Sequence, residues 1–321
     1  MFFALFLLSS IYPYASFAQK KLEKEKEKIF TEGLALYTLI LANWTSNDIY
    51  YENEFNTNIV KGYLSYKDKD TLKTIFWREI DTTSAEYKKS VFKNTGDTVA
   101  AEQMNNQPFE LIRIVKTVRY AHMRVAKKNA SIADEDERDP TPIEKMIIAY
   151  RAMVYKEINT DTSFFKLYAG TKLRAIPVDA GKEMRVYVYS STIKESIMPI
   201  GGDYLLIYDK KEKTLISKED IHKDCVFIST QYNGHSSDAS KATQHIHKKD
   251  AAELITPTDI ATLLLYKSQL EWDEHRVVSD KYTCIFTLVD RKLDIMLTKD
   301  FENLKKIKTE KENERKKTDM H

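Results

Sequence analysis

The stretch His245-Ile-His-Lys-Lys-Asp-Ala-Ala-Glu-Leu-Ile-Thr-Pro-Thr-Asp-Ile-Ala-Thr-Leu-Leu-Leu-Tyr266 predicts a short strand, a connecting loop and a helix. On a strand, side chains at positions i and i+2 point to the same face. His245 and His247 are therefore expected to share one face, while Ile246 faces the core on the other. The helix is expected over residues 257–271.

The start of that helix is marked by several residues. Thr256 is a favourable N-cap, Pro257 suits the first helical position, and Asp259 completes a capping box. Ile255 and Ile260 stand where a hydrophobic staple would close over the same turn. The pattern therefore places a carboxylate in the first turn of a helix that closely follows the two histidines.

Two imidazoles and one carboxylate can converge at this turn. His245, His247 and Asp259 would supply three protein ligands to a zinc ion and leave a fourth position open for water. Two simpler interpretations remain open. Helix capping alone accounts for Thr256 and Asp259, and a His-x-His pair is most often two exposed histidines on an edge strand.

These residues, in this order and at this separation, resemble the JAMM/MPN metalloprotease signature, in which His-x-His is followed by Ser-x-x-Asp. Thr256 stands where that family has Ser, and the loop is one residue longer than the commonest form. The resemblance implies that His245, His247 and Asp259 bind zinc and that Thr256 steadies the tetrahedral intermediate. The whole chain is similar to secreted bacterial proteins that share a Thr-Asp-Ile core after a His-x-His.

The general base of the JAMM family is an upstream Glu, four residues before a pair of Leu residues. The segment Pro199-Ile-Gly-Gly-Asp-Tyr-Leu-Leu206 resembles that region and places Gly201 at the position of the base. Asp203 would face the same side of a strand, about 6.6 Å further along it. Glu195 is the other nearby carboxylate, so Asp203 or Glu195 would have to accept the proton.

Composition limits the class of protein. A chain of 321 residues is long enough for one large domain or two modest ones. The 50 basic and 48 acidic residues give a net charge of +2, which indicates no nucleic-acid partner. Hydrophobic residues make up 42%, which favours a globular fold over disorder. The sequence contains neither a P-loop nor a dinucleotide-binding fingerprint.

Residues 1–18 are expected to be a signal peptide. Phe2 to Leu8 is an apolar run, and Ser16-Phe17-Ala18 before Gln19 has the small residues of a cleavage site. The alternative is an uncleaved N-terminal anchor, for which the apolar stretch is short. No later segment is apolar enough to span a membrane. We therefore expect a secreted or periplasmic protein after cleavage near Ala18–Gln19.

An oxidising compartment would allow Cys225 and Cys284 to form a disulfide. Both lie in strand-like stretches and could pair if those strands are neighbours. Buried free thiols are the equal alternative.

Residues 19–159 are expected to form a helical and hairpin region, with apolar spacing indicating the helices and alternation indicating the strands. A capping box at Thr141 predicts the start of its last helix. The expected elements are helix 20–44, strands 62–66, 72–78 and 87–92, helix 108–123, an acidic linker at 133–138 and helix 142–158.

Residues 160–298 are expected to form a JAMM-like domain, followed by a charged tail at 299–321 that is either a frayed helix or disordered. A flexible loop is expected at 232–242. The expected strands around the histidine strand and its helix are 172–176, 185–189, 204–208, 214–217, 226–229, 275–279, 282–289 and 293–297. The predicted fold class is α+β, with an N-terminal helical and hairpin region before a mixed β-sheet that has one embedded helix.

Two functions follow from these patterns. The first is a zinc-dependent amide hydrolase, a peptidase of JAMM type, that acts outside the cytoplasm on a peptide or a cell-wall peptide stem. The second is a catalytically inactive JAMM-like binding or scaffold protein of the cell envelope, which the missing base Glu favours. A third possibility is that the histidines are purely structural. If Gly201 holds the position of the base, the wild type should be a poor hydrolase, and Gly201→Glu should restore the carboxylate.

Overall fold

The computed structural model describes residues 5–53, 59–80, 112–133, 137–192, 196–230, 242–270 and 272–318, with side chains from Gln19 to Arg315 within these ranges. The strand predicted at 87–92, most of the loop predicted at 232–242 and the carboxylate of Glu195 lie outside the described residues.

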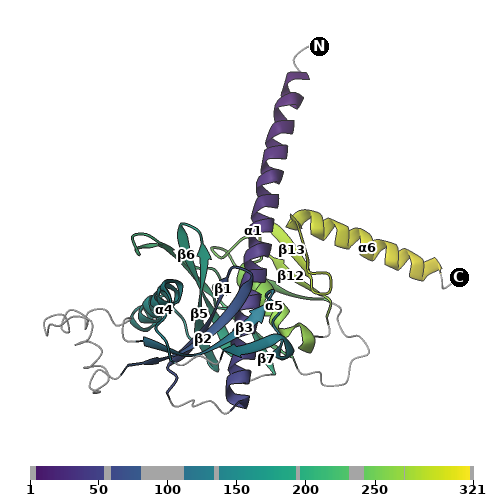
Figure 1. Cartoon of the computed structure of the whole chain (residues 1–321). Helices are drawn as coiled ribbons and strands as arrows, with labels where there is room; N and C mark the ends of the chain where they lie inside the picture. Colours follow the sequence, from purple (N-terminus) through teal and green to yellow (C-terminus); the bar gives the residue numbers. More distant parts are fainter. Residues whose placement is uncertain are drawn as a thin grey trace.

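One long helix, α1 (Leu5–Glu52), runs through the molecule (Figure 1). Its first turns project from the body, and its later turns are enclosed by strands. The helix predicted from residue 20 to 44 is confirmed, but it extends further at both ends. The expected cleavage point near Ala18–Gln19 falls within this helix.

Four antiparallel strands form a sheet beside the C-terminal half of α1, in the order β1-β2-β3-β4. They are β1 (Gly62–Asp68), β2 (Thr71–Glu79), β3 (Ile112–Ala121) and β4 (Ala130–Ala133), with a short 3-10 helix, η2 (Lys127–Asn129), before β4. The predicted β1–β2 hairpin is confirmed, with Lys69 in its turn at a φ of 55°.

The helix predicted over residues 108–123 is wrong, because residues 112–121 form strand β3. Val115 and Val118 fit a helical spacing, but Ile112, Ile114 and Tyr120 also alternate with polar residues. β-branched residues dominate this segment, and they favour strands. Pairing with both β2 and β4 decides between the two patterns.

The second four-stranded sheet is also antiparallel, in the order β5-β6-β8-β9. It follows α4 (Pro142–Thr160), whose predicted capping box between Thr141 and Glu144 is confirmed. The strands are β5 (Thr171–Ala180), β6 (Glu183–Thr192), β8 (Tyr204–Asp209) and β9 (Leu215–Asp220). Strand β7 (Ile197–Gly201) lies between β6 and β8 in the chain but belongs to another sheet. It pairs with β10 (Cys225–Ser229), which follows β9, as a separate two-stranded sheet.

The last sheet is mixed and contains the embedded helix. Its order is β11-β12-β13-β14, with β11 parallel to β12 and the other pairs antiparallel. Its elements are β11 (Ala242–Ile246), α5 (Pro257–Tyr266), a 3-10 turn η3 (Lys267–Gln269), β12 (Glu274–Val278), β13 (Tyr282–Thr287) and β14 (Lys292–Leu297). Helix α5 is therefore the crossover that two adjacent parallel strands require. The charged tail forms an exposed helix, α6 (Thr298–Thr318).

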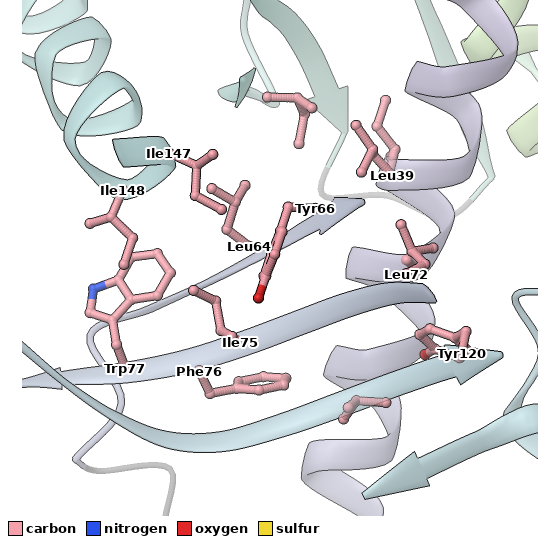
Figure 2. Close-up of a cluster of buried hydrophobic side chains, with 14 of the residues drawn as sticks. Leu39, Leu64, Tyr66, Leu72, Ile75, Phe76, Trp77, Tyr120, Ile147 and Ile148 are labelled. Carbon is pink, nitrogen blue, oxygen red and sulfur yellow. The ribbon is translucent and has the colours of Figure 1, made fainter. Parts of the chain in front are cut away.

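Two hydrophobic clusters connect α1 to the rest of the fold. In the first, side chains of α1, β1–β3 and α4 surround Tyr66 and Ile75 (Figure 2). This cluster also contains Ile176, Tyr187 and Tyr189, so it extends across residue 159, where the sequence suggested a domain boundary. The fold is α+β, as predicted, and its core is shared between both parts of the chain.

The second cluster fixes α5, which carries the candidate site. Ile260, Leu263 and Leu264 of α5 pack there with residues of β12–β14 and with Ile29 of α1. At the crossing of the two helices, a Cβ on Gly33 would lie 2.8 Å from Cβ of Ile260. The absence of a side chain at residue 33 therefore lets α1 approach the first turn of α5.

Both cysteines are free: Cys225 is half-buried on β10 and Cys284 is buried on β13. These strands belong to different sheets, so the condition for a disulfide is not met. Among the described residues, no helix has the length and apolar character needed to cross a membrane.

Candidate metal centre

Four buried side chains from three parts of the fold meet at one point. His222 lies in the connection between β9 and β10, His245 lies on β11, His247 directly follows β11, and Asp259 lies in the first turn of α5. One ligand atom of each residue lies within 4.8 Å of those of the other three. The structure therefore brings together the three residues predicted to bind metal and adds His222.

Strand β11 has the predicted alternation, but the buried face is the one that carries the histidines and not the one that carries Ile246. His245 and His247 are 7% and 4% exposed, whereas Ile246 is 66% exposed. The expectation that Ile246 faces the core is therefore wrong. The alternation along a strand shows which side chains share a face, but it does not show which face is buried. Here α5 and the β9–β10 connection pack against the face that carries the histidines.

Helix capping and metal binding use different oxygens of Asp259. Its Oδ2 accepts hydrogen bonds from the backbone N–H of Thr256 at 2.9 Å and from the hydroxyl of Thr256 at 2.9 Å. Thr256 Oγ1 in turn accepts from the N–H of Asp259 at 3.1 Å. The cap therefore orients the carboxylate so that Oδ1 lies toward His222 and His245, while Nε2 of His247 lies nearer the capping oxygen, Oδ2. The hydroxyl of Thr256 is taken up by the cap, so its proposed contact with a tetrahedral intermediate has no support here.

The separations of the ligand atoms can be compared with the edges of a tetrahedral zinc site. Nε2 of His222 lies 3.0 Å from Oδ1 of Asp259, and Nε2 of His245 lies 3.0 Å from Nε2 of His247. Nε2 of His245 and of His247 lie 3.6 Å from Oδ1 and Oδ2 of Asp259, respectively. Zinc–ligand distances of about 2.0–2.1 Å give a tetrahedron with edges of about 3.3–3.4 Å. Three separations among the four ligand atoms, 3.0, 3.0 and 3.6 Å, fall on both sides of that value, and all the separations lie within 4.8 Å.

Hydrogen bonding within the described residues leaves part of this group unsatisfied. Both ring nitrogens of His222 and Oδ1 of Asp259 are buried without a hydrogen-bond partner there. Because buried polar atoms are nearly always paired, this needs an explanation. The 3.0 Å contact between the two residues lacks hydrogen-bond geometry, so a metal ion bound to both atoms would satisfy them.

A second layer of contacts orients the imidazoles. Nδ1 of His247 donates to the carbonyl of Ala252 at 2.8 Å, which leaves a lone pair on its Nε2. Nδ1 of His245 is 2.8 Å from Nε2 of His275, whose Nδ1 is 2.8 Å from the hydroxyl of Thr243. Metal-binding histidines usually have such a partner on the other ring nitrogen.

Asp203 lies beside the other ring nitrogen of His222 without forming a hydrogen bond to it. Its Oδ2 lies 3.5 Å from Nδ1 of His222, and its Oδ1 accepts from the backbone N–H of Ser190 at 3.0 Å. Asp203 is therefore on the side of the imidazole opposite to Asp259. It is 2% exposed, and it faces the back of His222 rather than the point where the ligand atoms converge.

The electrostatics keep two of the histidines neutral. Burial lowers the pKa of His245 to about 3 and that of His275 to about 4. Burial opposes ionisation of Asp259, but the His222 and His245 imidazoles outweigh it and hold the pKa of Asp259 well below its usual range. Burial likewise lowers the pKa of His222, but Asp259 and Asp203 raise it to about 9. A bound metal ion would replace the proton of His222 as the cation beside Asp259.

Gly201 cannot serve as the site of a general base. It ends β7 with a φ of +87°, and a Cβ there would lie 2.5 Å from the carbonyl oxygen of Asp224. A side chain at this position therefore meets rigid backbone in a conformation that non-glycine residues rarely adopt. The expectation that Gly201→Glu would restore a base on the correct face is wrong.

Sequence reasoning missed His222 because the residue is 23 positions upstream of His245. The signal was indirect. Strands β8 and β9 form a hairpin in which Tyr204 pairs with Asp220, and the N–H of Ile221 donates to the carbonyl of Asp203 at 3.1 Å. The predicted strand 214–217 would have to continue for five residues, beyond the end of β9 at Asp220, to bring His222 close to Asp203.

A pocket of about 390 Å³ borders the histidines. Its lining includes His222, His245 and His247, but not Asp259. Comparisons with known proteins add no assignment, since no family model, no curated protein and no solved structure matches this chain.

Proposed function

We propose that this chain is a zinc-binding protein in which His222, His245, His247 and Asp259 hold one ion. The convergence of these four buried side chains within 4.8 Å carries the proposal. Three imidazoles and one carboxylate are ligands that zinc accepts, and four protein ligands are typical of closed, non-catalytic zinc sites. When bound, the ion would cross-link β11, α5 and the β9–β10 connection.

We further propose a binding protein rather than a hydrolase. Amide hydrolysis at such a site needs a position for water and a base within hydrogen-bond reach of it. His222 takes the place of the fourth ligand, Asp203 lies behind that imidazole, and Gly201 has no room for a carboxylate. These features support the inactive form of the JAMM-like interpretation, in which the order β11–α5–β12 and the ligands His245, His247 and Asp259 agree with the resemblance.

A zinc-dependent peptidase acting outside the cytoplasm is the second candidate, because the pocket reaches all three histidines. Zinc can add a fifth ligand in catalytic sites. A mixed peptide library incubated with zinc-loaded wild type separates the candidates. We expect no cleavage. Cleavage that is abolished by a chelator and restored by zinc would favour the peptidase.

Metal content tests the zinc site itself. Wild-type protein should retain one zinc per chain after dialysis, and His222→Ala and His247→Ala should retain much less. His122→Asn is the matched control, because His122 lies far from the site in the chain at a φ of 50°, which Asn tolerates. Equal zinc in all four proteins would refute the site.

We also propose export, on the basis of the apolar segment before Gln19. N-terminal sequencing of the mature protein should begin near Gln19. Recovery of the intact chain from the cytoplasm would contradict export without affecting the metal site.

A further inference from the structure

The pocket borders three of the four proposed ligands. Its lining includes His222, His245 and His247 but not Asp259, which is fully buried. In a tetrahedral site, the face formed by three ligands is opposite to the fourth. A molecule in this pocket would therefore reach the ion through the three-histidine face, on the side opposite to Asp259.

The pocket has apolar walls and a charged rim. Ile200 of β7 and Val226 of β10 line it, and Val226 is 44% exposed. Lys223, Asp224 and Lys248 lie at its rim. A pocket of about 390 Å³ falls within the range of small-molecule sites.

The charges favour an anion at the inner end of this pocket. Three neutral imidazoles and the Asp259 carboxylate leave one positive charge on a divalent ion, which the Asp203 carboxylate behind His222 offsets in part, and Lys223 and Lys248 carry positive charge at the rim. Two carboxylates compete for the lysines: Asp224 pairs with Lys248, and Asp220 Oδ2 lies 3.5 Å from Lys223 Nζ. In the Lys248–Asp224 pair both side chains are more than half exposed, and such pairs contribute only about 0–1 kcal/mol. An entering anion can therefore displace Asp224 from Lys248.

We propose that the pocket binds a small molecule carrying a carboxylate. Its carboxylate enters through the three-histidine face, and Lys248 exchanges Asp224 for the ligand. The carboxylate supplies an oxygen ligand to the ion and an acceptor for Lys248, and the apolar walls accommodate the rest of the molecule. This inference rests on the proposed metal site. The ligand needs one carboxylate on a compact apolar body. Both the C-terminus of a peptide and a free organic acid have this chemistry.

The test uses the full-length chain loaded with Co²⁺, because four-coordinate Co²⁺ absorbs visible light much more strongly than five-coordinate Co²⁺. The probes are N-acetyl-dialanine with a free C-terminus, the same peptide as its C-terminal amide, and acetate. The free peptide should weaken the visible bands with saturation, and the amide should not. Acetate acting as strongly as the peptide would identify the ligand as a free acid, and weaker binding of acetate would identify it as a peptide C-terminus.

Three variants test the role of the rim. Lys248→Ala should weaken binding of the carboxylate ligand about tenfold, which is the effect of losing one charge-assisted hydrogen bond. Asp224→Asn should tighten binding roughly two- to fivefold, because it removes the competitor for Lys248. Lys211→Ala is the control, since Lys211 lies in the β8–β9 turn with a side chain 90% exposed, and it should leave binding unchanged.

Two results would overturn the inference while leaving the metal site intact. One is stoichiometric Co²⁺ binding with no spectral response to either carboxylate. The other is a response that neither Lys248→Ala nor Asp224→Asn alters. Failure of the wild type to bind Co²⁺ would instead refute the proposed function on which the inference depends.

Discussion

Nε2 of His222 and Oδ1 of Asp259 lie 3.0 Å apart in the interior of the protein, yet neither atom forms a hydrogen bond within the described residues. The two residues are 37 positions apart in the chain and reach each other from the β9–β10 connection and from α5. A cation between them satisfies both atoms. This contact distinguishes a four-ligand site from the three-ligand site that His245, His247 and Asp259 alone would form.

Asp203 should control how tightly the site holds zinc. Asp203→Asn can keep the bond from the N–H of Ser190, but it removes the carboxylate beside Nδ1 of His222. Loss of such a partner typically costs about 10–100-fold in metal affinity. Competition with a chromophoric chelator measures the effect. Asp179→Asn, an exposed carboxylate on β5, is the control, and an Asp203→Asn affinity equal to that of the control would contradict this role.

Gly33 should be required for the close approach of α1 and α5. Gly33→Ala would raise helix propensity by about 1 kcal/mol, but its Cβ would lie 2.8 Å from Cβ of Ile260. Overpacking of this kind costs about 1–3 kcal/mol, so we expect a net loss of about 1 kcal/mol in the free energy of unfolding. Urea unfolding measures it. Gly181→Asn, at an open position with a φ of +82°, should change little. A Gly33→Ala variant more stable than wild type would refute the packing argument.

Glu144 should make stability depend on pH in the acidic range. Burial opposes its ionisation, but hydrogen bonds from Arg138, the N–H of Thr141 and Tyr66 outweigh burial and hold its pKa at about 2. Because the folded pKa lies below the unfolded value of about 4.3, the contribution is present above that value and is lost as the pH falls towards 2. This shift in pKa corresponds to about 3 kcal/mol in the free energy of unfolding.

The Glu144→Gln variant tests this dependence. It should lose about 3 kcal/mol relative to wild type at pH 7 and much less at pH 2, measured by denaturant unfolding at both values. Glu212→Gln, in an exposed turn, serves as the control. A difference between Glu144→Gln and wild type that does not change with pH would show that the carboxylate charge has no such role.

The sequence predicted the parts of the site that are local in the chain. His245 and His247 follow from strand periodicity, and Asp259 follows from the capping box, because neighbouring residues determine both patterns. His222 depends on the β8–β9 hairpin and on how that sheet meets β11. No local pattern carries this information.

Two incorrect predictions about the fold have the same origin. Residues 112–121 fit helical and strand periodicities about equally, and their pairing with β2 and β4 decides the outcome. The outward position of Ile246 depends on which face of β11 is covered by α5. In both cases, contacts between distant segments override a pattern that local sequence leaves undecided.

Zinc K-edge X-ray absorption of the loaded wild-type protein tests the central claim most directly. The account predicts four nitrogen and oxygen neighbours at about 2.0–2.1 Å, with the outer-shell scattering of three imidazoles. The His222→Ala protein should show two imidazoles under the same conditions. A wild-type spectrum with only two imidazoles would contradict the assignment of His222 as a ligand, and failure of the wild type to bind zinc would contradict the account as a whole.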